Sequence, residues 1–194
     1  MNKEIKVLVL SGSIRKESYT RSLAEHTVGI LGKKNVSVIH WNLLEKPLPI
    51  MVPELRDDVD NHPDATVKEF AKQARECDAY VLASPIYHNS FSGALKNAID
   101  HLRSAHFTYK PMGLMSFGGD GSLQAVDQLR IIGRSVHAIV TTEIVCASED
   151  DFSGMELTSE ELKNRIEKFC DELILFAETF GPIRETKKKH VKNK

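Results

Sequence analysis

The sequence has few cysteines, no marked excess of either charge and no long hydrophobic run. Its three cysteines, Cys77, Cys146 and Cys170, lack C-x-x-C spacing, which indicates buried thiols in a reducing compartment rather than a disulfide framework. The formal net charge of -1 argues against the basic surface that nucleic-acid binding requires, so no nucleic-acid partner is expected. After Lys3 and Glu4 only a short apolar run follows, far below the length of a signal peptide or a membrane span. We therefore expect a cytoplasmic protein with no membrane partner.

Three common motifs for nucleotides and metals are also missing. Neither the Walker pattern G-x-x-x-x-G-K-[ST] nor the dinucleotide fingerprint G-x-G-x-x-G occurs in the chain. His101 and His106 do not have the paired spacing of H-E-x-x-H, so no metal site is expected.

What the chain does contain is an alternation of apolar strands and amphipathic helices along its 194 residues. Apolar runs predict strands at 5–10, 36–41, 79–84, 112–117 and 137–146. Apolar residues at helical spacing predict helices at 21–31, 64–77, 92–102, 123–133 and 162–180. Several prolines between Asn42 and Pro63 predict a long irregular connection.

This alternation predicts an α/β protein with three layers, because each parallel connection must cross over the sheet. We expect one domain over residues 1–183, with a five-stranded parallel sheet of order 2-1-3-4-5 and a ligand site beyond the carboxyl ends of the strands. Residues 184–194 are basic and nearly free of apolar side chains. They predict a solvated, disordered tail, with contact to nucleic acid or an anionic surface as the alternative.

The loop after the first predicted strand is unusually rich in hydroxyl groups. They belong to Ser11, Ser13, Ser18 and Thr20. Gly12 permits close backbone approach, and Arg15 adds a permanent positive charge. Such a loop, running into a helix with unpaired N–H groups, suits a phosphate. The alternative is a serine-rich helix cap, although capping requires only one hydroxyl.

The loop after the third predicted strand, Ser84–Gly93, combines a proline with two aromatic residues. Pro85 stiffens the exit from the strand, and Tyr87 and Phe91 offer flat surfaces. Backbone N–H groups beside aromatic walls suit a planar heteroaromatic ligand. The alternative is a loop whose aromatic rings pack on the neighbouring helix. His88 is more typical of a solvated residue than of a general acid.

The loop after the fourth predicted strand, Ser116–Ser122, contains three glycines in four positions. Glycines allow backbone to approach a ring or a partner chain closely, and the alternative is a flexible turn. Because the carboxyl ends of parallel strands share one edge, we expect the three loops to meet there.

Two motifs now identify a resemblance. G-S-x-R-x-x-S at Gly12–Ser18 and S-P-x-Y-x-x-S-x-x-G-x-L-K-N-A-x-D at Ser84–Asp100 resemble motifs of the NAD(P)H-dependent FMN reductase family, which has a flavodoxin-like fold. The stretches at 109–111 and 130–136 are most similar to its bacterial azobenzene-reductase (azoreductase) branch. The resemblance extends to about Phe180 and excludes the basic tail.

The resemblance implies roles for individual residues. The FMN phosphate would be held by Ser11, Ser13, Arg15, Ser18 and Thr20. The isoalloxazine and ribityl chain would be bordered by Pro85, Ile86, Tyr87 and His88, and the far side of the ring closed by Ser116, Gly118 and Gly119. Thr20, Ile86 and His88 depart from the family, which often has asparagine, an acidic residue and asparagine at these positions. Thr20 keeps a hydroxyl donor, and backbone N–H groups can serve at the other two positions.

The implied reaction is reduction of FMN by NADPH or NADH, followed by electron transfer to an azo dye, a quinone or free flavin. No catalytic side chain is implied, because the flavin carries the chemistry. The family also implies a homodimer or homotetramer. The alternatives are a flavodoxin-like electron carrier or an FMN sensor without nicotinamide turnover. Carrier flavodoxins are usually strongly acidic, whereas this chain is nearly neutral.

Overall fold

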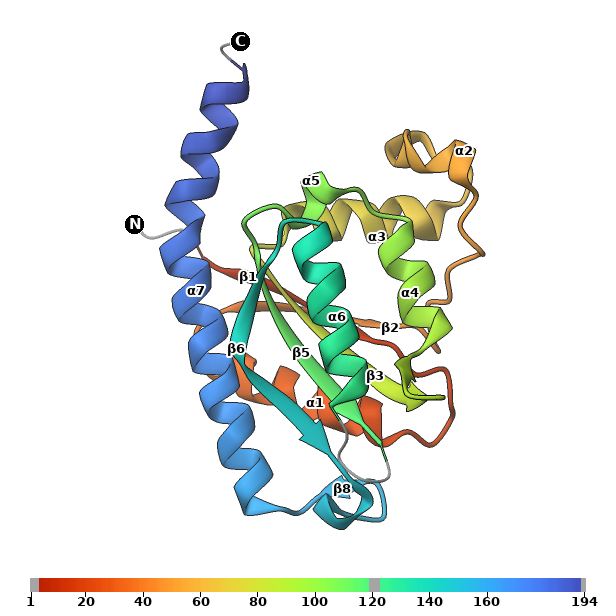
Figure 1. The fold of residues 1–194 in the computed structure, drawn as a ribbon, viewed down its shortest axis with the longest axis vertical. Coiled ribbons are helices and arrows are strands. Elements are labelled where there is room, and N and C mark those ends of the chain that lie inside the picture. The colour runs from red at the N-terminus through yellow and green to blue at the C-terminus, as the bar shows by residue number, and fades with distance from the viewer. Residues whose placement is uncertain (1–3, 119–122, 193–194) are drawn as a thin grey trace.

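The computed structural model describes the backbone of residues 4–118 and 123–192, and the side chains in these ranges as far as Lys187. Figure 1 shows the chain as a central sheet flanked by helices. The strands are β1 (Lys6–Ser11), β2 (Ser37–Asn42), β3 (Ala79–Tyr87), β4 (Ser90–Phe91), β5 (Pro111–Phe117), β6 (Ile139–Ala147), β7 (Phe152–Ser153) and β8 (Glu156–Leu157). The α-helices are α1 (Tyr19–Gly32), α2 (Pro53–Arg56), α3 (Ala65–Glu76), α4 (Gly93–Asp100), α5 (Ser104–Phe107), α6 (Gln124–Ser135) and α7 (Glu160–Lys192), and the 3-10 turns are η1 (Val59–Asn61) and η2 (Glu149–Asp151).

The five long strands pair in parallel in the order β2-β1-β3-β5-β6. This confirms the predicted order 2-1-3-4-5, because β5 and β6 are the fourth and fifth long strands along the chain. The short β4 turns back antiparallel to the end of β3, and β7 and β8 form a separate hairpin after β6. The parallel strands therefore end together at one edge of the sheet.

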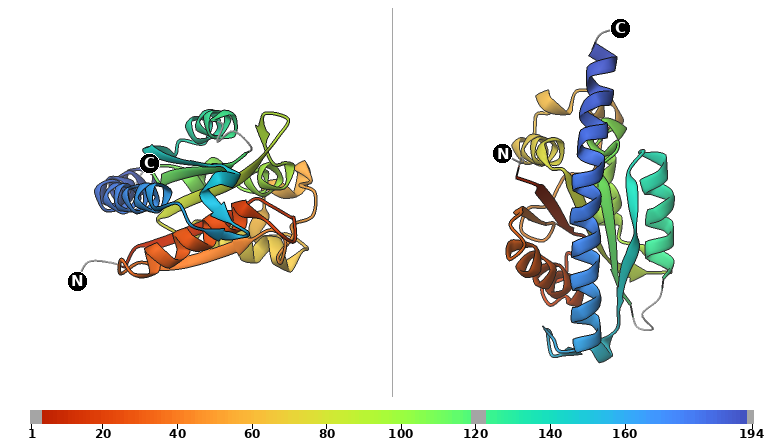
Figure 2. Two further views of the ribbon diagram at one scale, coloured as in Figure 1. Left: turned by 90° about the horizontal axis from the view of Figure 1, so that it is seen from below. Right: turned by 90° about the vertical axis from the view of Figure 1, so that its left-hand side faces the viewer.

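Helices cover both faces of the sheet (Figure 2), as the apolar run of β1 requires. Val7 and Val9 pack in one hydrophobic cluster with α1 and α7. Leu8 and Leu10 point the other way and pack with α3, α4 and α6. Successive strand side chains alternate between the faces, so a strand buried on both sides is continuously apolar.

Several boundaries differ from the prediction, and β3, for example, runs to Tyr87 instead of ending at residue 84. β6 begins at Ile139 rather than at residue 137, because His137 has a φ of 61° and donates its N–H to the Arg134 carbonyl oxygen at 3.2 Å. His137 therefore belongs to the turn after α6. The proline-rich connection from residue 42 to 63 also includes the short helices α2 and η1.

The largest difference lies at the C-terminal end. The prediction ended the last helix before Pro182, because proline lacks an N–H group and its ring collides with the preceding turn. In the structure α7 continues to Lys192, so the predicted disordered tail does not begin at residue 184. Arg184 is only 7% exposed, and its Nη2 lies 2.5 Å from Asp78 Oδ1 at the start of β3. This buried ion pair anchors the chain immediately after the proline.

No helix in the described ranges is long and apolar enough to cross a membrane. The described residues also contain no cluster of three or more histidine, cysteine, aspartate and glutamate side chains that could hold a metal ion.

Candidate functional site

The loop between β1 and α1 lies tightly against β3 and α4. The Gly12 N–H donates to the Ala83 carbonyl oxygen at 2.8 Å, and the Ser92 hydroxyl donates to the Gly12 carbonyl oxygen at 2.6 Å. A Cβ atom at Gly12 would lie 2.9 Å from both the Ala83 oxygen and Leu95 Cβ. Glycine therefore permits the close approach that carries the loop over the carboxyl edge of the sheet.

The start of α1 provides unpaired donors at this edge. Ser18 caps the helix, since its Oγ accepts a hydrogen bond from the Arg21 N–H at 3.2 Å. The N–H groups of Tyr19 and Thr20 meet no acceptor within the described ranges. The first N–H groups of a helix carry partial positive charge, so this helix start favours an anion.

Two hydroxyls and a guanidinium accompany these N–H groups. Ser13 and Thr20 are each 1% exposed as residues. Ser13 Oγ accepts from the Arg15 N–H at 3.4 Å, and its own proton meets no acceptor in the described part of the chain. The Arg15 side chain is exposed and makes no ion pair with any described residue. These donors suit a phosphate, which accepts several hydrogen bonds and requires neutralisation.

The donors line a cavity of about 330 Å³, which the ends of β3 and β5 complete. The cavity contains eight of the predicted site residues, Ser13, Arg15, Ser18, Thr20, Pro85, Ile86, Tyr87 and Gly118. The loops after the first, third and fourth long strands thus meet at one edge, as the sheet order predicts.

Two predicted serines do not line this cavity. Ser11 Oγ lies 2.8 Å from His40 Nε2 of β2, and the Ser116 hydroxyl donates to Cys146 Sγ at 3.4 Å. Burial lowers the pKa of the His40 ring and raises the pKa of the Cys146 thiol, so both groups favour their neutral forms. The hydroxyls of these serines are therefore engaged inside the protein. Gly119, another predicted site residue, lies outside the described residues.

The hairpin between β3 and β4 holds Tyr87 at the cavity. His88 and Asn89 turn the chain with φ values of 49° and 61°. Gln128 of α6 secures the turn, because its Oε1 accepts from the Ser90 hydroxyl at 2.6 Å and its Nε2 donates to the Asn89 carbonyl oxygen at 2.7 Å. His88 is exposed in this turn and does not line the cavity, unlike the prediction.

Sequence reasoning missed several lining residues. They are Glu17, Tyr19, Phe117, Glu149 and Met155. The Tyr19 and Phe117 rings stack with centroids 4.5 Å apart, and Phe152 of β7 lies 4.9 Å from the Tyr19 ring. Tyr19 and Phe117 belong to loops that the sequence already singled out, so their aromatic character was an available signal. Glu149 and Met155 follow β6, where no motif marks them.

The fold and the cavity together define a flavodoxin-like protein whose residues fit FMN. The donors around Ser13 and Arg15 match a phosphate, and Ile86 and Tyr87 offer the apolar shelf that a planar ring needs. Solved structures share the fold. The NAD(P)H:acceptor oxidoreductase FerB from Paracoccus denitrificans matches with a TM-score of 0.74 and 20% identity, over 91% of this chain and 98% of that one. A flavodoxin from Streptococcus pneumonia TIGR4 matches with a TM-score of 0.60 and 16% identity, over 89% of this chain and 99% of that one.

Sequence comparison identifies the family. The model of the NADPH-dependent FMN reductase family matches residues 5–152, and the chain belongs to this family. It is 32% identical to the FMN-dependent NADPH-azoreductase of Staphylococcus saprophyticus, over 89% of this chain and 95% of the relative. It is 30% identical to the enzyme of the same name from Staphylococcus haemolyticus, with the same coverage. The protein is thus an NAD(P)H-dependent oxidoreductase with FMN as its cofactor.

Proposed function

We propose that this enzyme transfers electrons from NADPH or NADH to a small azo compound, with quinones and free flavin as further acceptors. The observation that supports the proposal is a single cavity in which the hydroxyl-rich loop lies beside the apolar surface of Ile86, Tyr87 and Met155. Tyr87 and Met155 both line the cavity and remain 42% and 38% exposed, so a planar acceptor can reach the shelf from solvent. The azoreductase relatives support an azo compound as the acceptor.

At the phosphate end, four side chains have the right chemistry. Arg15 supplies a positive charge and forms no ion pair with a described residue, although Glu17 and Glu149 line the same cavity, and the hydroxyls come from Ser13, Ser18 and Thr20. Their place at the start of α1 adds the partial charge of the helix. Ser11 contributes indirectly, because its hydroxyl is already bonded to His40.

At the ring end, the ends of β3 and β5 supply a wall of the cavity. A Cβ atom at Gly118 would lie 2.7 Å from Ile86 Cδ1, so the glycine lets the ends of β3 and β5 close together. Bound FMN supplies the two-electron redox chemistry that links the nicotinamide to the acceptor. Pro85, Ile86 and Tyr87 orient the ring, and this reaction requires no acidic or basic side chain of the protein.

An anaerobic titration tests the proposal. FMN-loaded, desalted protein is titrated with NADPH and separately with NADH while the visible flavin band is followed, and the reduced protein is then mixed with methyl red, menadione or free FMN. We expect stoichiometric bleaching and the fastest recovery of colour with the azo dye. Loss of FMN on desalting would contradict the cavity assignment, and retained FMN that stays yellow with both nucleotides would contradict the reductase reaction. Recovery with only the quinone or free flavin would contradict the azo acceptor.

We also infer a single FMN-binding domain that works in the cytoplasm as a homodimer or homotetramer without nucleic acid. The three unpaired cysteines support a reducing compartment. The near-neutral charge supports the absence of a nucleic-acid partner. Sedimentation equilibrium tests the assembly, since the 21.8 kDa chain should give two or four times its mass.

A further inference from the structure

Arg21 binds the phosphate loop without lining the cavity. Its Nη1 donates to the Arg15 carbonyl oxygen at 2.8 Å, and its Nη2 donates to the Lys16 carbonyl oxygen. Its Nε lies 3.8 Å from a carboxylate oxygen of Glu25, one helical turn further on. The Arg21 side chain is only 16% exposed, and its donors are directed at the protein.

The position of this arginine is unfavourable for the helix itself. Arg21 stands three residues after the cap Ser18, where a glutamate would complete a capping box. A cation in the first turn is also disfavoured by the helix dipole. The i, i+4 pair with Glu25 contributes little to the helix, so the two bonds to the loop explain an arginine here better than helix stability does.

These two bonds determine how the loop presents its backbone. In a trans peptide the carbonyl group and the following N–H point in opposite directions, and the described residues contain no cis peptide bond. Since the Arg15 and Lys16 carbonyls are turned to Arg21, the N–H groups of Lys16 and Glu17 point away from it. Carbonyl oxygens repel a phosphate, whereas successive N–H groups attract one.

We propose that Arg21 is a positioning residue for the FMN phosphate. It holds two carbonyl oxygens away from the anion, so that the loop presents N–H groups together with Arg15. The proposal rests on the FMN site described above and adds a residue that contacts neither the phosphate nor the ring.

The test compares FMN with riboflavin, which lacks the phosphate. Dissociation constants for both flavins are measured by fluorescence quenching on the full-length apoprotein and on Arg21→Ala, Arg21→Lys and Glu25→Gln variants. Arg21→Lys keeps the charge but loses the fork that binds two carbonyls. Glu25→Gln removes the ion pair and leaves both carbonyl bonds in place.

We expect Arg21→Ala and Arg21→Lys each to weaken FMN binding about ten-fold, with riboflavin binding within about two-fold of the unmodified protein. Glu25→Gln should bind both flavins normally. Unaltered riboflavin binding also shows that a variant is folded. If Arg21→Ala does not fold, the comparison is made with Arg21→Lys.

Full FMN affinity in Arg21→Lys would overturn the proposal, because it would show that only the charge matters. Equal losses of FMN and riboflavin binding would also overturn it, because they would indicate a general structural role. Unchanged FMN binding in Arg21→Ala would overturn it as well. Failure of the unmodified protein to bind FMN would instead contradict the underlying FMN site.

Discussion

Buried polar residues gather at both ends of the parallel sheet, and the two groups differ in how many of their hydrogen bonds are made within the protein. At the amino end, Asp78 accepts hydrogen bonds from the Lys6 N–H at 3.1 Å and from Arg184 Nη2 at 2.5 Å. Lys110, which is 3% exposed, donates to the Ala74 carbonyl oxygen at 2.7 Å at the end of α3. The Asp78 carboxylate and the Lys110 ammonium are thus bonded within the protein and hold elements together, although Arg184 Nε and His106 Nε2 at the same end have no hydrogen-bond partner among the described residues.

The carboxyl end has more open donors, and they surround one cavity. The proton of Ser13, the N–H groups of Tyr19 and Thr20, and the guanidinium of Arg15 have no partner within the described residues. Buried polar groups are normally paired, so donors that remain open at a cavity indicate a ligand. The difference separates a structural polar cluster from a binding site.

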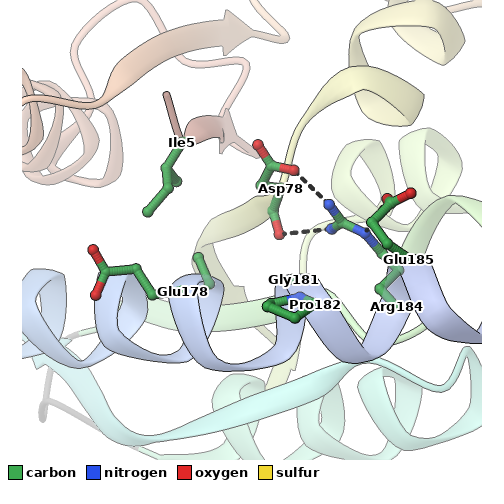
Figure 3. Close-up of a pocket in the computed structure, with 8 residues that line it drawn as sticks. Ile5, Asp78, Glu178, Gly181, Pro182, Arg184 and Glu185 are labelled. Carbon is green, nitrogen blue, oxygen red and sulfur yellow. Dashed lines mark hydrogen bonds and ion pairs between the residues drawn. The ribbon is translucent and has the colours of Figure 1, made fainter. Parts of the chain in front are cut away.

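Cavity size does not make this distinction. The cavity beside the C-terminal part of α7 measures about 760 Å³, more than the 330 Å³ of the cavity at the carboxyl edge of the sheet. Figure 3 shows that Asp78 and Arg184 in the larger cavity are bonded to each other, beside Gly181 and Pro182. The smaller cavity gathers several open donors around one space, and their chemistry suits a phosphate group.

Breaking the ion pair at the amino end should have the largest effect on stability. Asp78→Ala leaves the Arg184 guanidinium buried without its carboxylate, which costs about 3 kcal/mol or more of unfolding free energy. Urea denaturation should show this loss, while the folded fraction binds FMN normally. As a control, Lys34→Ala removes the more exposed pair with Asp171 and should cost less than about 1 kcal/mol. Equal losses in the two variants would show that burial of the pair is unimportant.

Acid should weaken the same end of the molecule through His106. Burial lowers the pKa of this histidine to about 4, and Nε2 has no hydrogen-bond partner within the described ranges. In the unfolded chain this histidine takes up a proton near pH 6.5, whereas in the folded protein it does so only near pH 4. The unfolding free energy is therefore highest above pH 6.5 and falls by about 2 kcal/mol as the pH approaches 4.

Urea denaturation at pH 7 and pH 4.5 measures this loss. In the unmodified protein the Arg103 N–H donates to His106 Nδ1 at 3.1 Å, and His106→Asn keeps an acceptor for this bond. The unfolding free energy of this variant should therefore fall less between the two pH values. The same pH dependence in the variant and the unmodified protein would assign the effect to other groups.

At the carboxyl end, Arg15→Ala should change binding rather than stability. Because Arg15 is exposed and unpaired with any described residue, the unfolding free energy should stay within about 0.5 kcal/mol. Loss of a charged phosphate contact should raise the FMN dissociation constant by about ten-fold or more. Fluorescence titration measures this change, and Arg56→Ala, an exposed arginine of α2, provides the control. An unchanged FMN affinity would remove Arg15 from the phosphate site.

The smallest effect is expected at the hairpin. Gln128→Ala removes both bonds that hold Asn89 and Ser90, so FMN and riboflavin should each bind about three-fold more weakly. Gln124→Ala, one turn earlier on α6 and exposed, should change neither. Loss confined to FMN would show that the hairpin acts on the phosphate end instead of the ring end.

The sequence was sufficient for the sheet and for much of the site. The apolar run at residues 5–10 indicates a central strand, and the alternation of strands and helices predicts the order that the structure confirms. Ser13, Arg15 and Ser18 could be placed at one cavity because loops at the carboxyl ends of parallel strands share one edge. These features depend on local composition and on general rules of topology.

Other features depend on partners that lie far apart in the sequence. The Ser11 hydroxyl bonds to His40 on a neighbouring strand, and α7 continues past Pro182 with Arg184 bonded to Asp78. The ring contacts among Tyr19, Phe117 and Phe152 likewise join three separate segments of the chain. Sequence periodicity predicts on which face of a helix or strand a residue lies, but it does not predict which distant side chain contacts that residue. The sequence alone therefore determined the sheet order and the position of the hydroxyl-rich loop after β1, and only tertiary packing decided which polar groups were satisfied internally and which remained open.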